Sequence, residues 1–489
     1  MNRSTLSLAG AVVALAVLTG AASMAGGDDS SAAPAASSSR LPVQRSTLLC
    51  PEPSTSEFAA TTYTSFTPAG SGSGSGTSGG QATLVPATTK PKALKPLTAT
   101  GKPVTSTTDA SDAPALIGTA DGSLAPGWSV GQTTVVSDGP GRGLLGTSCV
   151  VPDSEFWFPG ASTQDGRQDY VHLVNPDDTP AVVDIDLYGK DGQLKGSTGD
   201  GITVPGDSSK PVLLSTLIAD KVQDLTVHVV ARSGRVGAAV QSTDAKAGTD
   251  WLPAAAQPSG DLVMPGIPAD ATDVRLIAYA PGSDDADLTL KLATSSGTIT
   301  PADHETLHVK SGMTAAVDLG DVTRGDAGSL IVGSSSAHAA VPVVAGLRVT
   351  RGKGSDQEIA FLPATAPIDR EASVADNRSK GSTLGLTATG KDVSVKITSS
   401  AGSTGGTAVS RTVTVKAGTT VSMAPPQPSG LKGSYAVTVQ RLSGGRLYAS
   451  RMLALPLDGV PMFTIQPMPD DQGLVEVPLA GADLRVLEP

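Results

Sequence analysis

An internal repeat of about 105 residues is the feature that most constrains how this chain folds. When the sequence is slid against itself by that interval, three runs of alternating apolar and polar residues superimpose: 183–187, 288–292 and 393–397. Alternation with a period of two is typical of a strand with one buried face. A repeat of this length is long enough to be a domain, so the sequence predicts three tandem domains rather than a solenoid.

Further segments recur at the same interval. A second set of strand-like runs occupies 225–227, 330–332 and 435–437, and a turn glycine follows each run of the first set, at Gly192, Gly297 and Gly402. Each repeat therefore contains about seven short strands, which favours a two-sheet sandwich of immunoglobulin-like type. A closed barrel is the alternative that the pattern leaves open. Because a clear 3.6-residue period is missing, we expect an all-β fold.

The repeat boundaries come from an apolar strand that ends in proline. We expect this strand to open each repeat, at 156–159, 262–265 and 360–363. Gly and Pro between such strands mark the turns at which one strand ends and the next begins. The predicted segments are 151–258 for repeat 1, 259–358 for repeat 2, 359–457 for repeat 3, and 458–489 for C-terminal strands and a tail that caps the last repeat.

The first 27 residues have the pattern of a secretory signal peptide. Arg3 gives a positive start, residues 4–27 carry no charge, and small residues precede a cleavage point after Ala25. The uncharged stretch is also about long enough to span a bilayer, so an uncleaved anchor remains the alternative. Either interpretation predicts that the rest of the chain is secreted or extracytoplasmic, with membrane contact only through this segment. Residues 28–40 are rich in Ser and Ala, which predicts a flexible spacer.

The only two cysteines, Cys50 and Cys149, fit an oxidising compartment. We predict that they form a disulfide, with two separate buried thiols as the alternative. They bound a β-rich region at 41–150, which contains a Gly/Ser loop at 71–80. This region is either a divergent β domain or a set of strands docked on repeat 1.

The composition excludes some classes of partner. The net charge is -11, only 15 of 489 residues are aromatic, and basic blocks are missing, so we expect no nucleic-acid partner. The few rings also limit stacking surfaces for bases or sugars. Hydrophobic residues still reach 39%, enough to build cores rather than a disordered chain.

One motif resembles a catalytic site. His304, Glu305 and His308 match the H-E-x-x-H pattern of zinc proteases, which needs a helix to bring both imidazoles to one metal. The repeat register instead places the motif where a strand begins in the sister repeats. In a strand, residues i and i+4 lie about 13 Å apart, too far for two metal bonds of about 2 Å each. We therefore predict a surface strand, with no catalytic residue, metal or cofactor.

Acidic residues lie in equivalent hairpin loops of repeats 1 and 2. They are Asp177, Asp178, Asp284 and Asp285. Carboxylates in loops can bind calcium, but a spaced series of oxygen ligands is missing. Asp is also favoured in turns for its local hydrogen bonds. We expect the turn role.

The three tryptophans, Trp128, Trp157 and Trp251, are candidates either for sugar stacking or for burial. Trp157 lies in an apolar strand, which favours the core. Trp251 lies near a domain boundary, which favours a domain junction.

The chain resembles an uncharacterised family of secreted proteins from high-GC Gram-positive bacteria. The residues that carry the resemblance are the signal segment, 49–51, Cys149, 155–160 and the hairpin at 170–188. The resemblance implies no assigned activity. Members of that family are often encoded near a membrane glycosyltransferase, which implies a connection with envelope polysaccharide.

These observations favour a non-enzymatic protein of the cell envelope with a structural or interaction role. Its partner would be an envelope protein or a cell-wall glycan. The alternative is a carbohydrate- or wall-polymer-binding accessory protein in envelope glycan assembly. A zinc hydrolase that uses His304, Glu305 and His308 is the least favoured hypothesis.

Overall fold

A computed structural model describes residues 39–70, 79–88, 91–196, 198–335 and 340–477. The chain forms a large compact unit at 42–474 and a small unit, of which 39–41 and 475–477 are described. The predicted signal segment, most of the spacer, most of the Gly/Ser loop and the end of the tail lie outside the described residues. Within the described ranges, no helix is long and apolar enough to cross a membrane.

The small unit is built around two paired strands, β1 (Ser39–Pro42) and β35 (Leu474–Val477). Arg40 Nε lies 3.3 Å from Glu476 Oε1, and both side chains are more than half exposed. An ion pair this exposed contributes little to stability, so the strand pairing is the main contact described here.

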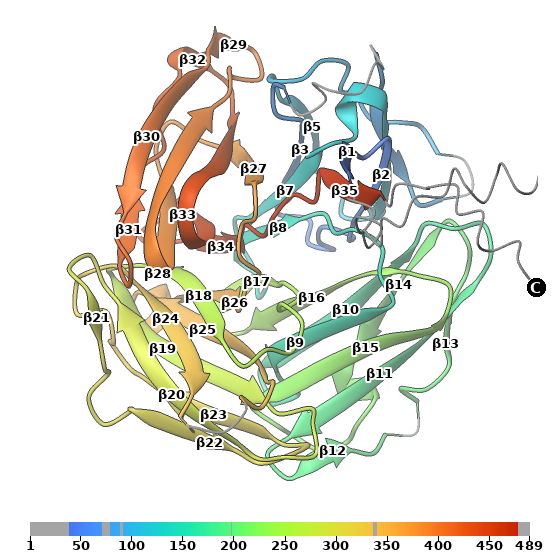
Figure 1. The fold of residues 1–489 in the computed structure, drawn as a ribbon. Helices are drawn as coiled ribbons and strands as arrows, with labels where there is room; N and C mark the ends of the chain where they lie inside the picture. Colours follow the sequence, from blue (N-terminus) through green and yellow to red (C-terminus); the bar gives the residue numbers. More distant parts are fainter. Residues whose placement is uncertain (1–38, 71–78, 89–90, 197, 336–339, 478–489) are drawn as a thin grey trace, which may run out of the picture. The chain divides into compact units, whose positions relative to one another are not determined.

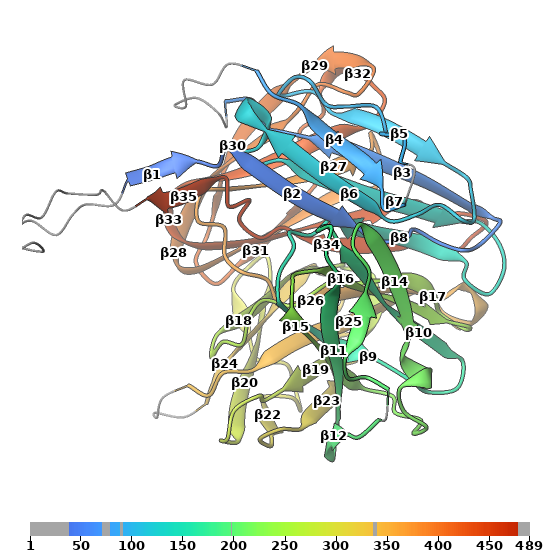
Figure 2. The same cartoon turned by 90° about the vertical axis from the view of Figure 1, so that its right-hand side faces the viewer.

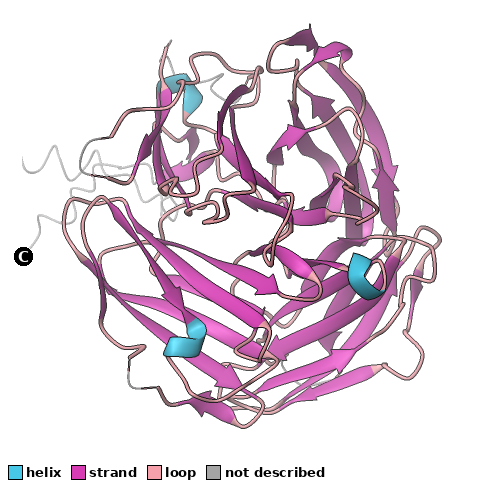
Figure 3. Ribbon diagram, turned by 180° about the vertical axis from the view of Figure 1, so that it is seen from behind, coloured by secondary structure: helices cyan, strands magenta, loops and turns pink. Residues whose placement is uncertain are grey.

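The all-β prediction is confirmed. In the described residues the helical segments are three short 3-10 turns, Gly122–Leu124, Leu214–Thr216 and Gly354–Asp356, and strands make up the rest of the regular structure (Figure 3). The strands of the large unit pair antiparallel in open sheets. Turns that contain Gly or Pro follow many of these strands, such as Gly234 after β15 and Gly352 after β25.

Repeat 1 has two facing sheets. The first has the order β12-β11-β15-β9 with β13 on β11, and the second has the order β14-β10-β16-β17. Apolar residues that alternate along β11 face the core between the sheets. The strands are β9 (Glu155–Ala161), β10 (Arg167–Asn175), β11 (Ala181–Gly189), β12 (Gly192–Leu194), β13 (Ile202–Val204), β14 (Ser208–Leu213), β15 (Leu225–Ser233), β16 (Gly237–Asp244) and β17 (Gly248–Leu252).

Repeat 2 has the same strand order. Its sheets are β18-β24-β20-β21, with β22 on β20, and β23-β19-β25-β26. The predicted run 288–292 lies in β20, the equivalent of β11. The strands are β18 (Leu262–Ile267), β19 (Ala271–Tyr279), β20 (Ala286–Ala293), β21 (Thr298–Ile299), β22 (Thr306–Val309), β23 (Thr314–Asp318), β24 (Gly328–Ser334), β25 (Val344–Arg351) and β26 (Glu358–Pro363).

Repeat 3 merges its layers through two long strands. β28 and β33 pair with each other along most of their length, and the sheet order is β27-β33-β28-β30, with β31 on β28 and β34 on β33. A separate ribbon pairs β29 with β32. The strands are β27 (Glu371–Asn377), β28 (Ser382–Ser399), β29 (Gly405–Thr407), β30 (Val409–Val415), β31 (Thr420–Met423), β32 (Ser429–Lys432), β33 (Tyr435–Ala454) and β34 (Phe463–Pro467).

The N-terminal region is a module with the same layout, which the sequence analysis left undecided. Its sheets are β2-β6-β4 and β5-β3-β7-β8 (Figure 2). Its own apolar core includes Trp128. The predicted disulfide is confirmed, with Cys50 Sγ bonded to Cys149 Sγ at 1.97 Å. The strands are β2 (Arg45–Cys50), β3 (Ala59–Phe66), β4 (Ala82–Pro86), β5 (Val104–Thr108), β6 (Leu116–Asp121), β7 (Ser129–Val136) and β8 (Gly143–Ser148).

The boundary between repeats 2 and 3 differs from the prediction. The segment 360–363, expected to open repeat 3, lies in β26 and pairs with β25, so it closes repeat 2. β27 opens repeat 3 instead, and the boundary moves from 358/359 to after Pro363. The boundary was predicted wrongly because the first and last strands of a repeat have the same sequence pattern. Both are short, apolar and close to a proline, as at Leu252-Pro253.

The modules of the large unit contact one another in a closed series. The first sheet of each module packs on strands of the second sheet of the next, through β2 on β16, β9 on β25, and β18 on β33. β27 of repeat 3 packs in turn on β3 and β7 of the N-terminal module. The last module therefore contacts the first.

The last strand of every module meets the others at one place, which we call the four-strand junction. β8 contacts β17, β17 contacts β26, β26 contacts β34, and β34 contacts β8 (Figure 1). Each of these strands pairs within its own sheet on one side only. Exposed strand edges are prone to aggregation, so the junction covers four edges at once.

Buried polar groups lie in the junction. The Asp250 carboxylate accepts hydrogen bonds from the N–H groups of Gly146, at 3.0 Å, and Trp251, at 2.8 Å. Glu358 is fully buried, and this burial raises its pKa to about 8, opposed in part by the positive charge of Arg142. A Cβ at Gly248, which also has a φ of +91°, would stand 2.0 Å from Glu358 Oε1. Only glycine fits there.

A Glu358→Gln variant tests the electrostatics of the junction. The raised pKa means that folded Glu358 keeps a proton which the unfolded chain releases above about pH 4.5, so stability falls as the pH rises towards 8. The free energy of unfolding of the wild type should fall by about 3–5 kcal/mol over that pH range. We expect Glu358→Gln to abolish this fall, because glutamine does not titrate. Thermal melts of both proteins at pH 5 and pH 9 measure it. Exposed Glu305→Gln is the control, and equal pH slopes for wild type and Glu358→Gln would contradict the assignment.

Candidate functional site

The H-E-x-x-H motif lies in a loop that leads into a strand. Thr306–Val309 forms β22, which pairs with β20, and His304 and Glu305 precede it. His308 Nδ1 lies 2.7 Å from Asp287 Oδ1, and its Nε2 lies 3.5 Å from Asp285 Oδ2. Among the described residues, no group of three or more His, Cys, Asp or Glu side chains is arranged to hold a metal. The structure thus pairs His308 with carboxylates.

The hairpin carboxylates lie at loop positions in the structure, and two of them make local contacts. Asp177 forms an ion pair with Arg235 at 3.2 Å. Asp285 Oδ1 accepts a hydrogen bond from the Ser311 N–H at 2.8 Å. Asp178 and Asp284 are exposed in the same loops. Turn and ion-pair contacts of this kind match the local bonding that favours Asp in loops.

Two of the tryptophans, Trp128 and Trp251, are buried in apolar clusters. Trp128 lies in the core of the N-terminal module, and its Nε1 donates to Ser65 Oγ at 2.9 Å. Trp251 is fully buried among residues of the N-terminal module and repeat 1, including Ala59 and Leu145. The predicted junction role of Trp251 is therefore confirmed.

Trp157 is buried, but between modules rather than in the core of its own sandwich. Phe156 and Phe158 belong to the repeat 1 core, so the alternation of the strand turns Trp157 to the opposite face. There its ring stacks on His228 with centroids 3.6 Å apart, and lies 5.5 Å from the ring of Tyr279 in repeat 2. Burial lowers the pKa of His228, against the opposing effect of Glu155.

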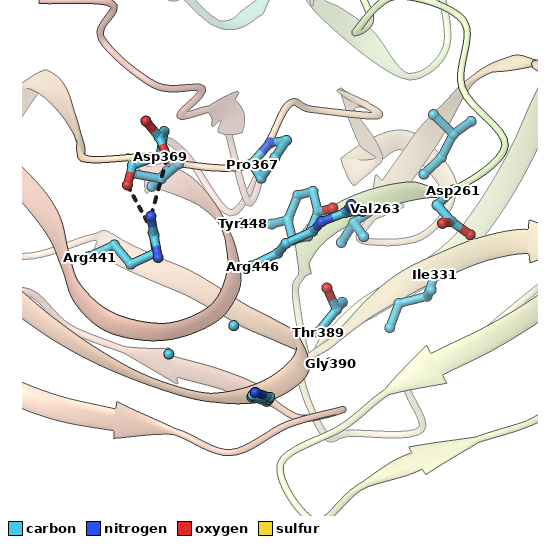
Figure 4. A pocket seen from close by; sticks show the side chains of 15 residues that line it. Asp261, Val263, Ile331, Pro367, Asp369, Thr389, Gly390, Arg441, Arg446 and Tyr448 are labelled. Atoms are coloured by element: carbon cyan, nitrogen blue, oxygen red, sulfur yellow. Dashed lines mark hydrogen bonds and ion pairs between the residues drawn. The ribbon is translucent and has the colours of Figure 1, made fainter. Parts of the chain in front are cut away.

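The equivalent position in repeat 2 carries smaller residues. Trp157 is opposite His228 in the β9–β15 pair, and Val263 is opposite Ile331 in the β18–β24 pair. A cleft of about 760 Å³ lies beside the second pair, between repeats 2 and 3 (Figure 4). We call this space the repeat 2–3 cleft.

The repeat 2–3 cleft combines apolar walls with charged groups. Ile331 and Pro367 contribute exposed aliphatic surface, and Val263 and Tyr448 line the cleft as buried side chains (Figure 4). Arg446 and Asp261 line the same space. Ligand pockets commonly have this composition, with mostly apolar walls and a few polar groups that orient the ligand.

The cations of the cleft differ in their partners. Arg441 donates to the Asp369 backbone oxygen at 2.9 Å and forms an ion pair with its carboxylate at 3.2 Å. Lys391 and Arg446 also line the cleft, are exposed, and have no ion pair within the described part of the chain. Two cations are therefore free to meet an anion, in a chain whose net charge is -11.

The described lining offers hydroxyl and carboxylate groups beside its cations. The hydroxyls belong to Thr389 and Tyr448, and the carboxylates to Asp261 and Asp369. The cleft could not be predicted from local sequence patterns because residues from two repeats form it. The signal that could have found it is the replacement of Trp157 and His228 by smaller residues in repeat 2.

A second cleft of about 780 Å³ lies between repeats 1 and 2. Its cations are mostly engaged: Arg275 forms an ion pair with Asp224 at 2.8 Å, and Lys221 lies 3.3 Å from Asp165. Lys310 also lines it. Because intramolecular partners already hold most of these charges, the repeat 2–3 cleft is the stronger candidate.

Comparison with known proteins gives one family match. A family model described as "Family of unknown function (DUF5719)" matches residues 104–426. The match runs from β5 of the N-terminal module into repeat 3 and includes Val263, Ile331 and Lys391 of the cleft. No curated protein matches the chain.

A Trp157→Ala variant tests how the contact between repeats 1 and 2 is filled. Removal of a buried tryptophan leaves a cavity and costs about 3–5 kcal/mol of unfolding free energy. Denaturant titration followed by circular dichroism measures the loss. Phe58→Ala is the control, since that ring is 54% exposed and we expect a change within about 0.5 kcal/mol. Equal effects of the two substitutions would show that the inter-repeat stack contributes nothing.

Proposed function

The chain belongs to this family of unknown function, and we propose that it is a non-enzymatic binding protein of the cell envelope, acting outside the cytoplasm. The observation that carries the proposal is the four-strand junction, which joins all four modules while leaving an open cleft between two of them. Rigid scaffolds that hold loops and clefts in fixed positions are suited to recognition.

The proposed location rests on two features of the sequence and structure. Disulfides persist in oxidising compartments and are rare in the cytosol, and Cys50 and Cys149 are bonded. Residues 1–27 have the charge and hydrophobicity pattern of an export signal. Together they support an extracytoplasmic protein that is secreted or associated with the envelope.

The proposed interaction role rests on how the modules are joined. Contacts between repeats 2 and 3 include hydrogen bonds from Ser450 Oγ to the Pro265 backbone oxygen at 2.6 Å and between Ser329 and Thr387 at 2.7 Å. Such contacts restrict relative motion of the modules. The cleft beside them then keeps its shape before a ligand arrives, which lowers the entropic cost of binding.

A second candidate function is the binding of a cell-wall polymer, in support of glycan assembly. It is favoured by the two free cations and the mixed polar and apolar walls of the repeat 2–3 cleft. The first candidate needs only a protein partner on any exposed surface, whereas this one needs the cleft itself. Binding of a glycan at the cleft would separate the two.

Fractionation of cells that produce the full chain tests the location. We expect the protein outside the cytoplasm with Cys50 and Cys149 oxidised, because export precedes disulfide formation. Alkylation of free thiols before and after reduction, followed by mass spectrometry, reports the oxidation state. A variant lacking residues 2–27 is the control and should stay inside with free thiols. Recovery of the full chain in the cytoplasm, reduced, would overturn the proposal.

A further inference from the structure

We infer that the repeat 2–3 cleft binds a saccharide that carries an anionic group, either phosphate or carboxylate. The inference rests on the proposed binding function and names the chemical class of the ligand. It is carried by three features: the cleft is built into a tight interface, its free cations come from two adjoining turns, and its walls offer both donors and acceptors.

The cleft is not a loose gap between modules. Beside it, the backbones of Gly266 and Gly385 approach so closely that a Cβ at Gly385 would stand 2.5 Å from the Cα of Gly266. The hydroxyl of Thr420 bridges the same interface, donating to the Ala293 backbone oxygen at 2.8 Å. The modules are therefore held in close contact beside the cleft.

Two adjoining turns carry the free cations. Lys391 lies where β28 bends, and Arg446 follows the bend of β33, opposite Thr389. A Cβ at Gly444, whose φ is +108°, would stand 2.0 Å from the Asp392 backbone oxygen, so glycine is required for the two bends to meet. Both cations line the same cleft, and guanidinium and ammonium groups both suit a phosphate or carboxylate.

The other polar groups favour a saccharide over an acidic peptide. Sugar hydroxyls both donate and accept, and the cleft supplies an acceptor carboxylate in Asp261 together with a hydroxyl in Thr389. The partly exposed side chain of Ile331 and the exposed ring of Pro367 suit the apolar face of a sugar. A peptide rich in carboxylates would bring several negative charges towards Asp261, whereas the inferred saccharide brings a single anionic group, and each like charge costs affinity.

Calorimetric titration of the full chain tests the inference. The probes are glucose 1-phosphate, galacturonate, neutral maltotetraose, inorganic phosphate and a short polyglutamate peptide. We expect at least one of the two anionic saccharides to bind about tenfold or more tightly than the other three probes. We expect the affinity to fall as salt is added, since the contact includes exposed charges.

Variants locate the site. Arg446→Gln combined with Lys391→Gln should weaken binding of the anionic saccharide about tenfold or more. Lys310→Gln, in the cleft between repeats 1 and 2, is the matched control and should leave it unchanged. Val263→Trp reproduces the residue of repeat 1 and should abolish binding by filling the cleft. Thermal melts establish whether each variant is folded. If Val263→Trp does not fold, the double variant Arg446→Gln with Lys391→Gln tests the site instead.

The outcomes separate this inference from the proposed function. Equal binding of maltotetraose overturns the anionic requirement, and equal binding of inorganic phosphate overturns the saccharide. Tightest binding of polyglutamate shows a peptide site instead. If no probe binds to folded, disulfide-bonded protein that fractionates outside the cytoplasm, the ligand assignment is wrong while the proposed location stands.

Discussion

The packing of four strand edges against one another is the constraint on which the rest of the large unit depends. Each module ends its second sheet with a strand that lacks a partner on one side, and the four-strand junction covers all of these edges. The junction is partly polar, since Asp250 and Glu358 are fully buried within it. Burying carboxyl groups is costly unless they are hydrogen-bonded or neutral. The raised pKa of Glu358 keeps this group uncharged near neutral pH and so reduces that cost.

Successive modules pack sheet on sheet in the same way, but different side chains occupy the contact in each case. Between repeats 1 and 2, Trp157 and His228 stack and meet Tyr279. Between repeats 2 and 3, the equivalent pair is small and a cleft remains. The contact between repeats 1 and 2 therefore holds a stack of rings beside its own cleft, while the contact between repeats 2 and 3 has aliphatic residues at the equivalent positions. The same fold thus presents different side chains at equivalent contacts.

Alternation along the strands made much of the fold predictable. The runs 183–187, 288–292 and 393–397 all lie in equivalent strands, because each has one face in a sandwich core. The N-terminal module was predicted to be β-rich, but whether it was a divergent β domain or a set of docked strands stayed open. Its strands bury polar residues, as where Thr61 and Thr134 share a hydrogen bond of 2.9 Å, and this weakens the alternation that marks a strand with one apolar face. The cleft was missed for a different reason, because it depends on contacts between residues far apart in the chain.

The arrangement also explains why recognition would sit between modules rather than at the free end of one. A loop at the end of a single sandwich is fixed only by its own two strands, and such loops are the mobile parts of a fold. Lys391 and Arg446 lie instead on bends of two long strands that pair with each other and run into the module core. Val263, opposite them in the cleft, is fixed by the neighbouring repeat. A ligand that contacts both sides meets groups whose positions are set before it binds, and it therefore pays little ordering entropy.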